Sequence, residues 1–248
     1  MRTLAHATLA LAALAAPAAS ALTTGCGGDA PPPASQDGPP GGGTSDGPTV
    51  DTPVGTNFSF FITSTGGPNG GDFRRSAADT DGLAGADALC RTKAAAAVPA
   101  AATKTWRAYL STATVNARDR IGAGPWFNRN GVMVASSVAN LHDATANNIN
   151  KTTAIDENGV VVPGRGDTPN QHDIITGSTA AGLVALTHCN NWTSSAATGV
   201  TTQTGHHDRD GGGADPTSWN SAHATSGCSA AAFVSTGGRG SFYCFAAD

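Results

Sequence analysis

The chain has 248 residues, of which 13% are charged and 39% hydrophobic, and its formal net charge is −4. Arg74-Arg75 is the only adjacent pair of basic residues, so the sequence lacks the basic stripe of a nucleic-acid-binding protein. After the N-terminal segment no run of 18 apolar residues occurs, which excludes a second membrane-spanning helix. We therefore expect neither a nucleic-acid partner nor a later membrane span.

Residues 1–26 have the composition of a signal peptide. Arg2 carries the only full positive charge, and Leu4 to Ala16 is almost entirely Ala and Leu. This apolar run is too short for a stable transmembrane helix. The segment is therefore expected to direct export.

The end of this segment, Leu22-Thr23-Thr24-Gly25-Cys26, resembles a bacterial lipobox, in which the cysteine is acylated. Leu22 lies one position earlier than usual, and ordinary cleavage near residues 18–20, leaving a free Cys26 thiol, is the alternative. Acylation would leave no odd thiol in an oxidising compartment. Gly27 differs from the Asp of an inner-membrane retention signal. We expect a lipid anchor at Cys26 and an outer-membrane or cell-surface location.

Residues 27–55 form a linker of Pro, Gly, Ser, Thr and Asp with no large apolar residue before Val50. Such a segment buries too little surface to offset its ordering entropy. It is typical of a flexible stalk that holds a domain away from a membrane.

Residues 56–248 are long enough for a single core. A β-rich segment at 58–64 comes first, followed by a helix over 82–97 that Asp81 can cap, and then by a strand over 105–111. Helix signals are absent after that strand. The later strand candidates are short and separated by long polar loops: Val132–Val134, Val160–Val162, Phe233–Ser235 and Ser241–Phe245. Disulfides are expected to brace these loops.

The four remaining cysteines, Cys90, Cys189, Cys228 and Cys244, account for two disulfides. Three pairings are possible, and spacing alone does not choose among them. Their surroundings give more information. Residues 82–90 and 106–111, together with Cys189-Asn-Asn-Trp192, Gly227-Cys228 and Phe242-Tyr243-Cys244, resemble the endostatin domain of collagens and bacterial surface lipoproteins with an endostatin-like domain.

This resemblance implies an α+β domain of the C-type lectin-like fold, with mixed twisted antiparallel sheets, one main helix and long loops. It also implies the nested pairing Cys90–Cys244 and Cys189–Cys228. Trp219-Asn220-Ser221 is similar to the Trp-Asn-Asp strand of calcium-dependent lectins, but Ser221 replaces a carboxylate ligand. The histidines of the endostatin zinc site have no counterpart in residues 50–70, and arginines are too few for its heparin surface. Neither ligand carries over.

The loop over 205–215 holds the best local constellation. Asp208 and Asp210, followed by Gly211, supply oxygen ligands in a spacing that suits calcium. His206 and His207 with Asp208 suit zinc or another transition metal instead, although neighbouring residues rarely both reach one ion. The interpretation without a metal is a solvated polar loop, or histidines that bond backbone carbonyls inside a loop-rich fold.

Two further His-Asp pairs, His142-Asp143 and His172-Asp173, favour a simple structural interpretation. Each Asp is expected to cap a turn, with its His packed beside it. His188 and His223, which flank the Cys189–Cys228 pair, are expected to be packing residues. No sequence motif for nucleophilic catalysis is present.

These features favour a non-catalytic cell-surface domain that binds an extracellular ligand, such as a glycan or a matrix component. A structural envelope protein is the second interpretation. A metal-dependent hydrolase using His206, His207 and Asp208 is the third. The expected binding residues are Trp192, His206, His207, Asp208, Asp210, Asp215 and Asn220.

Overall fold

The structure, a computed structural model, describes residues 57–248. The predicted signal segment, Cys26 and the linker lie outside this range. The described residues form small antiparallel sheets with one main helix and two disulfides, as the sequence predicted. Between residues 57 and 248 no helix combines the length and apolar character that a membrane crossing requires.

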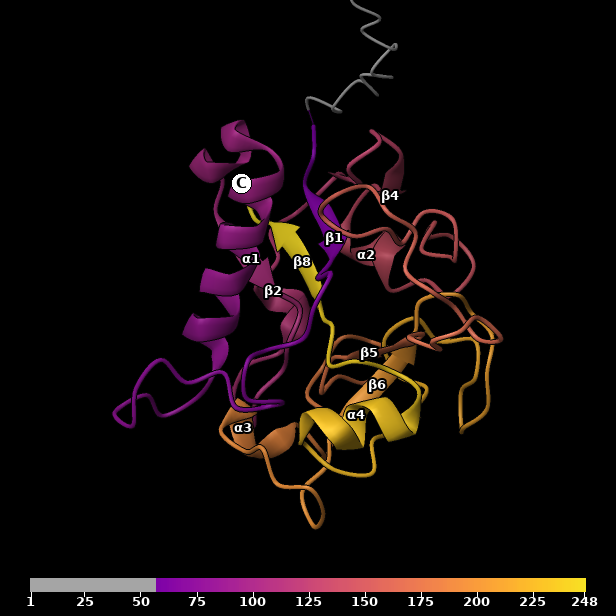
Figure 1. The fold of residues 1–248 in the computed structure, drawn as a ribbon. Coiled ribbons are helices and arrows are strands. Elements are labelled where there is room, and N and C mark those ends of the chain that lie inside the picture. The colour runs from indigo at the N-terminus through magenta and orange to yellow at the C-terminus, as the bar shows by residue number, and fades with distance from the viewer. Residues whose placement is uncertain (1–56) are drawn as a thin grey trace, which may run out of the picture. The chain divides into compact units, whose positions relative to one another are not determined.

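The central sheet places the C-terminal strand between two strands from the beginning of the domain. β8 (Tyr243–Ala246) pairs antiparallel with β1 (Phe60–Ile62) on one side and β2 (Trp106–Ala108) on the other (Figure 1). Successive side chains of a strand point to opposite faces. Phe61 and Cys244 accordingly join one hydrophobic cluster, and Phe60, Tyr243 and Phe245 join the other. Both faces of this sheet are therefore buried.

Helix α1 (Leu83–Ala97) covers the first face, followed by the 3₁₀ helix η1 (Pro99–Thr103) (Figure 1). The N-cap of the helix is Gly82, one position after the expected cap Asp81, whose Oδ1 nevertheless accepts a hydrogen bond from the Leu83 N–H at 2.9 Å. Ala86, Cys90 and Ala94 form the buried side of the helix. The disulfide Cys90–Cys244 then ties α1 to β8, the pairing that the endostatin resemblance implied.

The opposite face of the central sheet is covered by short elements and loops. These are the 3₁₀ helix η2 (Ala117–Asp119), strands β3 (Trp126–Phe127) and β4 (Met133–Ala135), and helix α2 (Val138–Leu141). Trp126 and Trp219 supply much of the buried aromatic surface of this cluster. Tightly packed aromatic side chains here take the place of longer regular elements.

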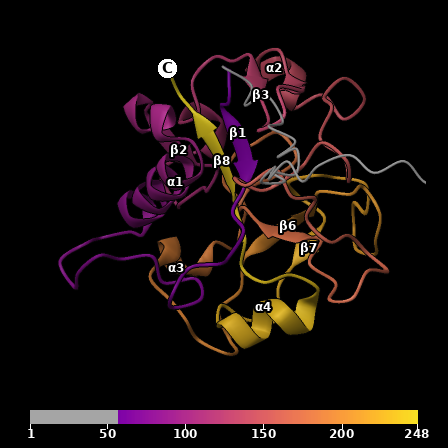
Figure 2. The same ribbon diagram turned by 45° about the horizontal axis from the view of Figure 1, so that its top comes forward.

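A second three-stranded sheet has the order β5 (Asp173–Ile175), β6 (Gln203–His206) and β7 (His223–Ala224). It lies near helix α4 (Ala230–Thr236) in both views (Figures 1 and 2). The disulfide Cys189–Cys228 ties helix α3 (Cys189–Trp192) to the segment before α4, which is the second implied pairing. Ile175 N–H donates to Ser241 O at 3.0 Å and thereby links this sheet to the chain entering β8.

Three sequence predictions differ from the structure. Phe233–Ser235, predicted as a strand, lies inside α4, so the expectation of no helix after residue 111 was wrong. Ser229 is the N-cap of this helix, and its side chain accepts a hydrogen bond from the Ala232 N–H. Gly237 is the C-cap. Val160–Val162, also predicted as a strand, forms only one isolated bridge, between Val161 and Ile155.

Candidate functional site

The second sheet gathers histidines and an aspartate at the paired ends of its three strands. In the antiparallel register Asp173 of β5 lies opposite His206 of β6, and His223 of β7 lies opposite Thr204. Paired residues, and residues two apart on a strand, share one face of a sheet. Asp173, His206 and His223 therefore meet on one face, and His172 joins them from the residue before β5.

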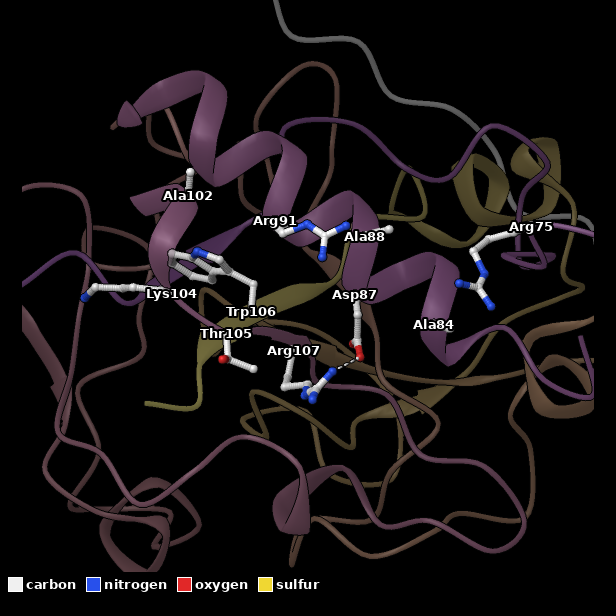
Figure 3. Close-up of a pocket in the computed structure, with 10 residues that line it drawn as sticks. All are labelled: Arg75, Ala84, Asp87, Ala88, Arg91, Ala102, Lys104, Thr105, Trp106 and Arg107. Carbon is white, nitrogen blue, oxygen red and sulfur yellow. Dashed lines mark hydrogen bonds and ion pairs between the residues drawn. The ribbon is translucent and has the colours of Figure 1, made fainter. Parts of the chain in front are cut away.

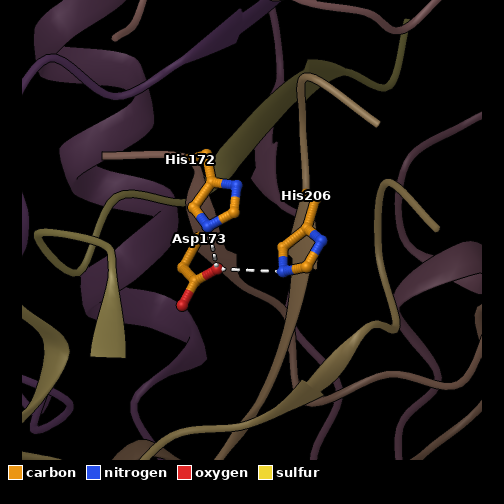
Figure 4. Close-up of side chains that lie close together, drawn as sticks. All are labelled: His172, Asp173 and His206. Atoms are coloured by element: carbon orange, nitrogen blue, oxygen red, sulfur yellow. Dashed lines mark ion pairs between the residues drawn. The ribbon is translucent and has the colours of Figure 1, made fainter. Parts of the chain in front are cut away.

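The imidazole groups converge on one carboxylate oxygen. Asp173 Oδ1 lies 3.3 Å from His172 Nε2, 3.2 Å from His206 Nε2 and 3.5 Å from His223 Nε2. Figure 4 shows His172 and His206 directed at this oxygen. His206 Nε2 and His223 Nε2 are 2.9 Å apart. We call His172, Asp173, His206 and His223 the histidine cluster.

The cluster is almost fully buried. The His206 side chain has no exposed surface, those of His172 and Asp173 are 6% and 2% exposed, and that of His223 is 25% exposed. Neither carboxylate oxygen of Asp173 accepts a hydrogen bond, although Oδ1 faces three nitrogen atoms. A buried carboxylate without a donor is costly, so this arrangement calls for a physical explanation.

The other ring nitrogen of each histidine lies against a backbone carbonyl. His172 Nδ1 is 2.9 Å from Asp210 O, His206 Nδ1 is 2.7 Å from Pro216 O, and His223 Nδ1 is 3.2 Å from Ala224 O. A carbonyl only accepts, so each Nδ1 carries the proton. In the neutral ring Nε2 then carries a lone pair instead of a proton.

Charge within the cluster follows from these contacts. Burial raises the pKa of Asp173, but its nearness to His206 and His223 outweighs burial and lowers that pKa below its usual value. The Asp173 carboxylate raises the pKa of His223 against the opposing effect of burial. Burial lowers the pKa of His172, yet contacts with Asp208 and Asp173 raise it overall. The Asp173 carboxylate therefore favours a positive charge beside it, which a protonated imidazole or another cation can supply.

The predicted metal ligands occupy different places. Asp208 Oδ1 lies 3.3 Å from His172 Nδ1, and Oδ2 accepts from Arg165 N–H at 2.6 Å, so this carboxylate supports the cluster from outside. His207 Nε2 faces Pro163 O at 3.3 Å, and burial lowers the pKa of His207 to about 4. Asp210 points to Arg165 with 69% of its side chain exposed.

The other expected binding residues divide between surface and core. Asp215 is exposed, whereas Trp192 is fully buried and donates through Nε1 to Ser111 O at 2.7 Å. Asn220 is also buried, and its Nδ2 donates to Tyr109 Oη and Thr179 O. Of the seven expected residues, only His206 belongs to the histidine cluster.

A second feature lies on the solvent side of α1. A cleft of about 450 Å³ opens between α1, η1 and β2, and its basic side chains are Arg75, Arg91, Lys104 and Arg107. Arg75 and Lys104 lie toward opposite ends, with Arg91 and Arg107 between them (Figure 3). We call these four residues with Asp87 the basic cleft. Asp87, its single carboxylate, already pairs with Arg107 and Arg120.

Sequence reasoning missed both features. His172-Asp173 was interpreted as a turn pair and His223 as a packing residue, yet both belong to the histidine cluster. The usable signal was the concentration of five of the chain's seven histidines within residues 172–223, one of them directly before Asp173. The basic cleft brings together residues 75, 91, 104 and 107, which come from three separate segments of the sequence.

Comparison with known proteins adds no assignment. No protein-family model matches this sequence, and no curated protein matches it.

Proposed function

We propose that this chain is a surface lipoprotein whose endostatin-like, C-type lectin-like domain binds an acidic extracellular glycan through the basic cleft. Cys26 carries the lipid, and residues 27–55 space the domain from the outer membrane. The domain acts by binding and carries out no catalytic step. The observation that carries the proposal is the gathering of four basic side chains around one cleft in a chain of net charge −4.

The size and charge of the cleft suit a sugar unit bearing sulfate or carboxylate. A cleft of about 450 Å³ lies within the usual range for small-ligand sites. Arg107 and Arg120 already neutralise Asp87, so this carboxylate adds little repulsion toward an anion. Guanidinium groups recognise sulfate and carboxylate through paired hydrogen bonds.

Arg91 is the best single probe of this proposal. It projects from the exposed side of α1 into the cleft, as Figure 3 shows, and has no ion-pair partner among residues 57–248. Arg75 pairs with Asp79 and Arg107 with Asp87, so substitution of either would also break an ion pair. Arg165, a half-exposed arginine outside the cleft, provides the matched control.

The test is retention of the full oxidised chain on immobilised sulfated glycosaminoglycan, neutral dextran and single-stranded DNA. We expect saturable binding to the sulfated glycan that weakens as salt rises, because exposed charges are screened. Arg91→Glu should weaken it at least about fivefold, the equivalent of roughly 1 kcal/mol, and Arg165→Glu should leave it unchanged.

Three results contradict the proposal. Equal retention on neutral dextran would remove the role of charge, and stronger retention on DNA would indicate a different ligand class. No retention on any matrix would favour the structural envelope interpretation.

A further inference from the structure

The histidine cluster has the composition and geometry of a metal centre. Three imidazole nitrogens lie within 3.5 Å of one carboxylate oxygen at the end of the β5–β6–β7 sheet, and the rings of His172 and His206 are stacked nearly parallel, so one of them would turn to bind an ion. Nitrogen-rich sets of this kind suit zinc and neighbouring transition metals, whereas calcium takes six to eight oxygen ligands. We propose that His172, Asp173, His206 and His223 bind one zinc ion that holds the three strands together.

The spacing of the donor atoms supports this proposal quantitatively. Zinc bonds of about 2.0–2.1 Å in a tetrahedron place neighbouring ligand atoms about 3.3 Å apart. Four of the six ligand pairs in the cluster lie at 3.3, 3.2, 3.5 and 2.9 Å. The donors are therefore close to their bound positions before any side chain moves far.

The proton positions supply a second, independent argument. Each Nδ1 donates to a backbone carbonyl, which fixes the tautomer that leaves Nε2 free to bind a metal. Histidine ligands in metal proteins are held in this way by the groups around them. Asp208 completes the surroundings, because its Oδ1 also faces His172 Nδ1.

The Asp173 carboxylate lacks hydrogen-bond donors, which is a third argument for a bound cation. Both oxygens of Asp173 are buried without a hydrogen-bond donor, while Oδ1 faces three nitrogen atoms. Without a cation the neutral rings would present lone pairs to a carboxylate. Several buried imidazolium ions would relieve this contact, but at a large desolvation cost. One dication satisfies all four groups together.

The burial of the cluster indicates a structural site. Four protein ligands close the tetrahedron, whereas a catalytic zinc keeps one position for water. The ligands come from β5, β6 and β7, so the ion would cross-link three short strands that are separated by long loops. Calcium at Asp208 and Asp210, which the sequence suggested, would use a different set of groups: Asp208 faces His172 and Arg165, and Asp210 is exposed beside Arg165.

The experiment uses the untagged full chain with its disulfides formed, stripped of metal and titrated with ZnCl₂ in competition with a chromophoric chelator. We expect one zinc per chain and, with free zinc about 100-fold above Kd, a rise in Tm of about 5–10 °C. Co²⁺ should give the intense visible absorption of a tetrahedral site. CaCl₂ should leave Tm unchanged.

His223→Gln is the principal variant, because His223 lies at the most exposed edge of the cluster and its replacement spares the buried rings. It should weaken zinc binding at least tenfold. Asp173→Asn, which keeps the shape of the side chain, should do the same. Asp210→Asn is the control and should bind zinc normally, since only the backbone carbonyl of Asp210 supports the cluster.

Circular dichroism of each metal-free variant separates lost binding from lost folding. Absence of stoichiometric zinc binding by the native chain would overturn the proposal. Protonated imidazoles, instead of a metal ion, would then balance the charge of Asp173. Unchanged affinity in a folded His223→Gln or Asp173→Asn chain would also overturn it. Calcium-specific stabilisation lost in Asp210→Asn would assign the site to the loop instead. None of these outcomes depends on glycan binding by the basic cleft.

Discussion

Individual polar side chains in the core have defined proton positions, and His142 is the clearest example outside the histidine cluster. Its Nδ1 lies 2.8 Å from Val138 O and therefore carries a proton, while Nε2 lies 2.7 Å from Tyr109 Oη and accepts from it. Tyr109 Oη in turn accepts from Asn220 Nδ2 at 2.9 Å. The chain Asn220–Tyr109–His142 thus requires a neutral imidazole.

This requirement predicts acid sensitivity. Burial lowers the pKa of His142 below 6.5, with a smaller contribution from Arg118. The unfolded chain therefore binds this proton first as pH falls, and the contribution of His142 to the free energy of unfolding is present above about pH 6.5 and lost below it. Urea titrations at pH 7.5 and 5 should show a smaller pH-dependent loss in His142→Gln than in the native chain. Equal losses would show that His142 does not titrate differently on folding.

Residue-level reasoning from sequence succeeded where one local signal dominated. The Asp81 start and the small apolar face at Ala86 and Cys90 predicted α1, and alternation predicted that Trp106 and Ala108 share a face. The same reasoning failed at Phe233, whose β-type side chain led to the prediction of a strand. Ser229 and Gly237, the capping residues at the two ends of α4, were the signals for a helix. The histidine cluster was beyond such reasoning, because its members meet only through the pairing of β5, β6 and β7.

At the scale of elements, Asp87 joins α1 to β2. Its carboxylate accepts from Ala108 N–H at 2.9 Å and pairs with Arg107 and Arg120. Asp87 and Arg120 are only 12% and 11% exposed, so removing one leaves the other a poorly solvated charge.

Asp87→Ala should therefore lower the free energy of unfolding by about 3 kcal/mol, the cost of breaking a buried pair. Asp79→Ala, which breaks an ion pair with the exposed side chain of Arg75, is the control and should cost less than about 1 kcal/mol. Urea denaturation of both variants measures the difference. Similar small losses would mean that Ala108 N–H and Arg120 find other partners when Asp87 is absent.

At the scale of the whole domain, the two disulfides brace regions of different construction. Cys90–Cys244 closes 154 residues and joins α1 to a central sheet that is buried on both faces. Cys189–Cys228 closes 39 residues, among which 194–201 and 207–222 contain no helix or strand. Both bridges are buried in the first hydrophobic cluster, but the inner one also closes the long loops around it.

The stabilising effect of a disulfide grows only with the logarithm of its loop, so loop entropy alone assigns similar upper values of about 5 kcal/mol to the outer bridge and about 4 kcal/mol to the inner one. We therefore expect the two bridges to differ in which part of the domain they stabilise, more than in how much they stabilise it. In Cys189→Ala/Cys228→Ala, the loops at 194–201 and 207–222 lose their cross-link and the first hydrophobic cluster loses two buried sulfur atoms, while the second cluster and the Cys90–Cys244 bridge are unchanged. Local opening then precedes global unfolding.

Limited proteolysis followed by mass spectrometry measures this opening directly. Cuts should appear first within residues 193–222 of the inner double variant, at protease levels that leave the native chain intact. Cys90→Ala/Cys244→Ala is the matched control and should lose stability without selective cleavage there, because its inner loop remains closed. Cleavage of both variants at the same sites would mean that the domain opens as one cooperative unit. Added zinc should slow the cuts in the inner variant, because the proposed ligands His206 and His223 lie inside the loop that this variant leaves open.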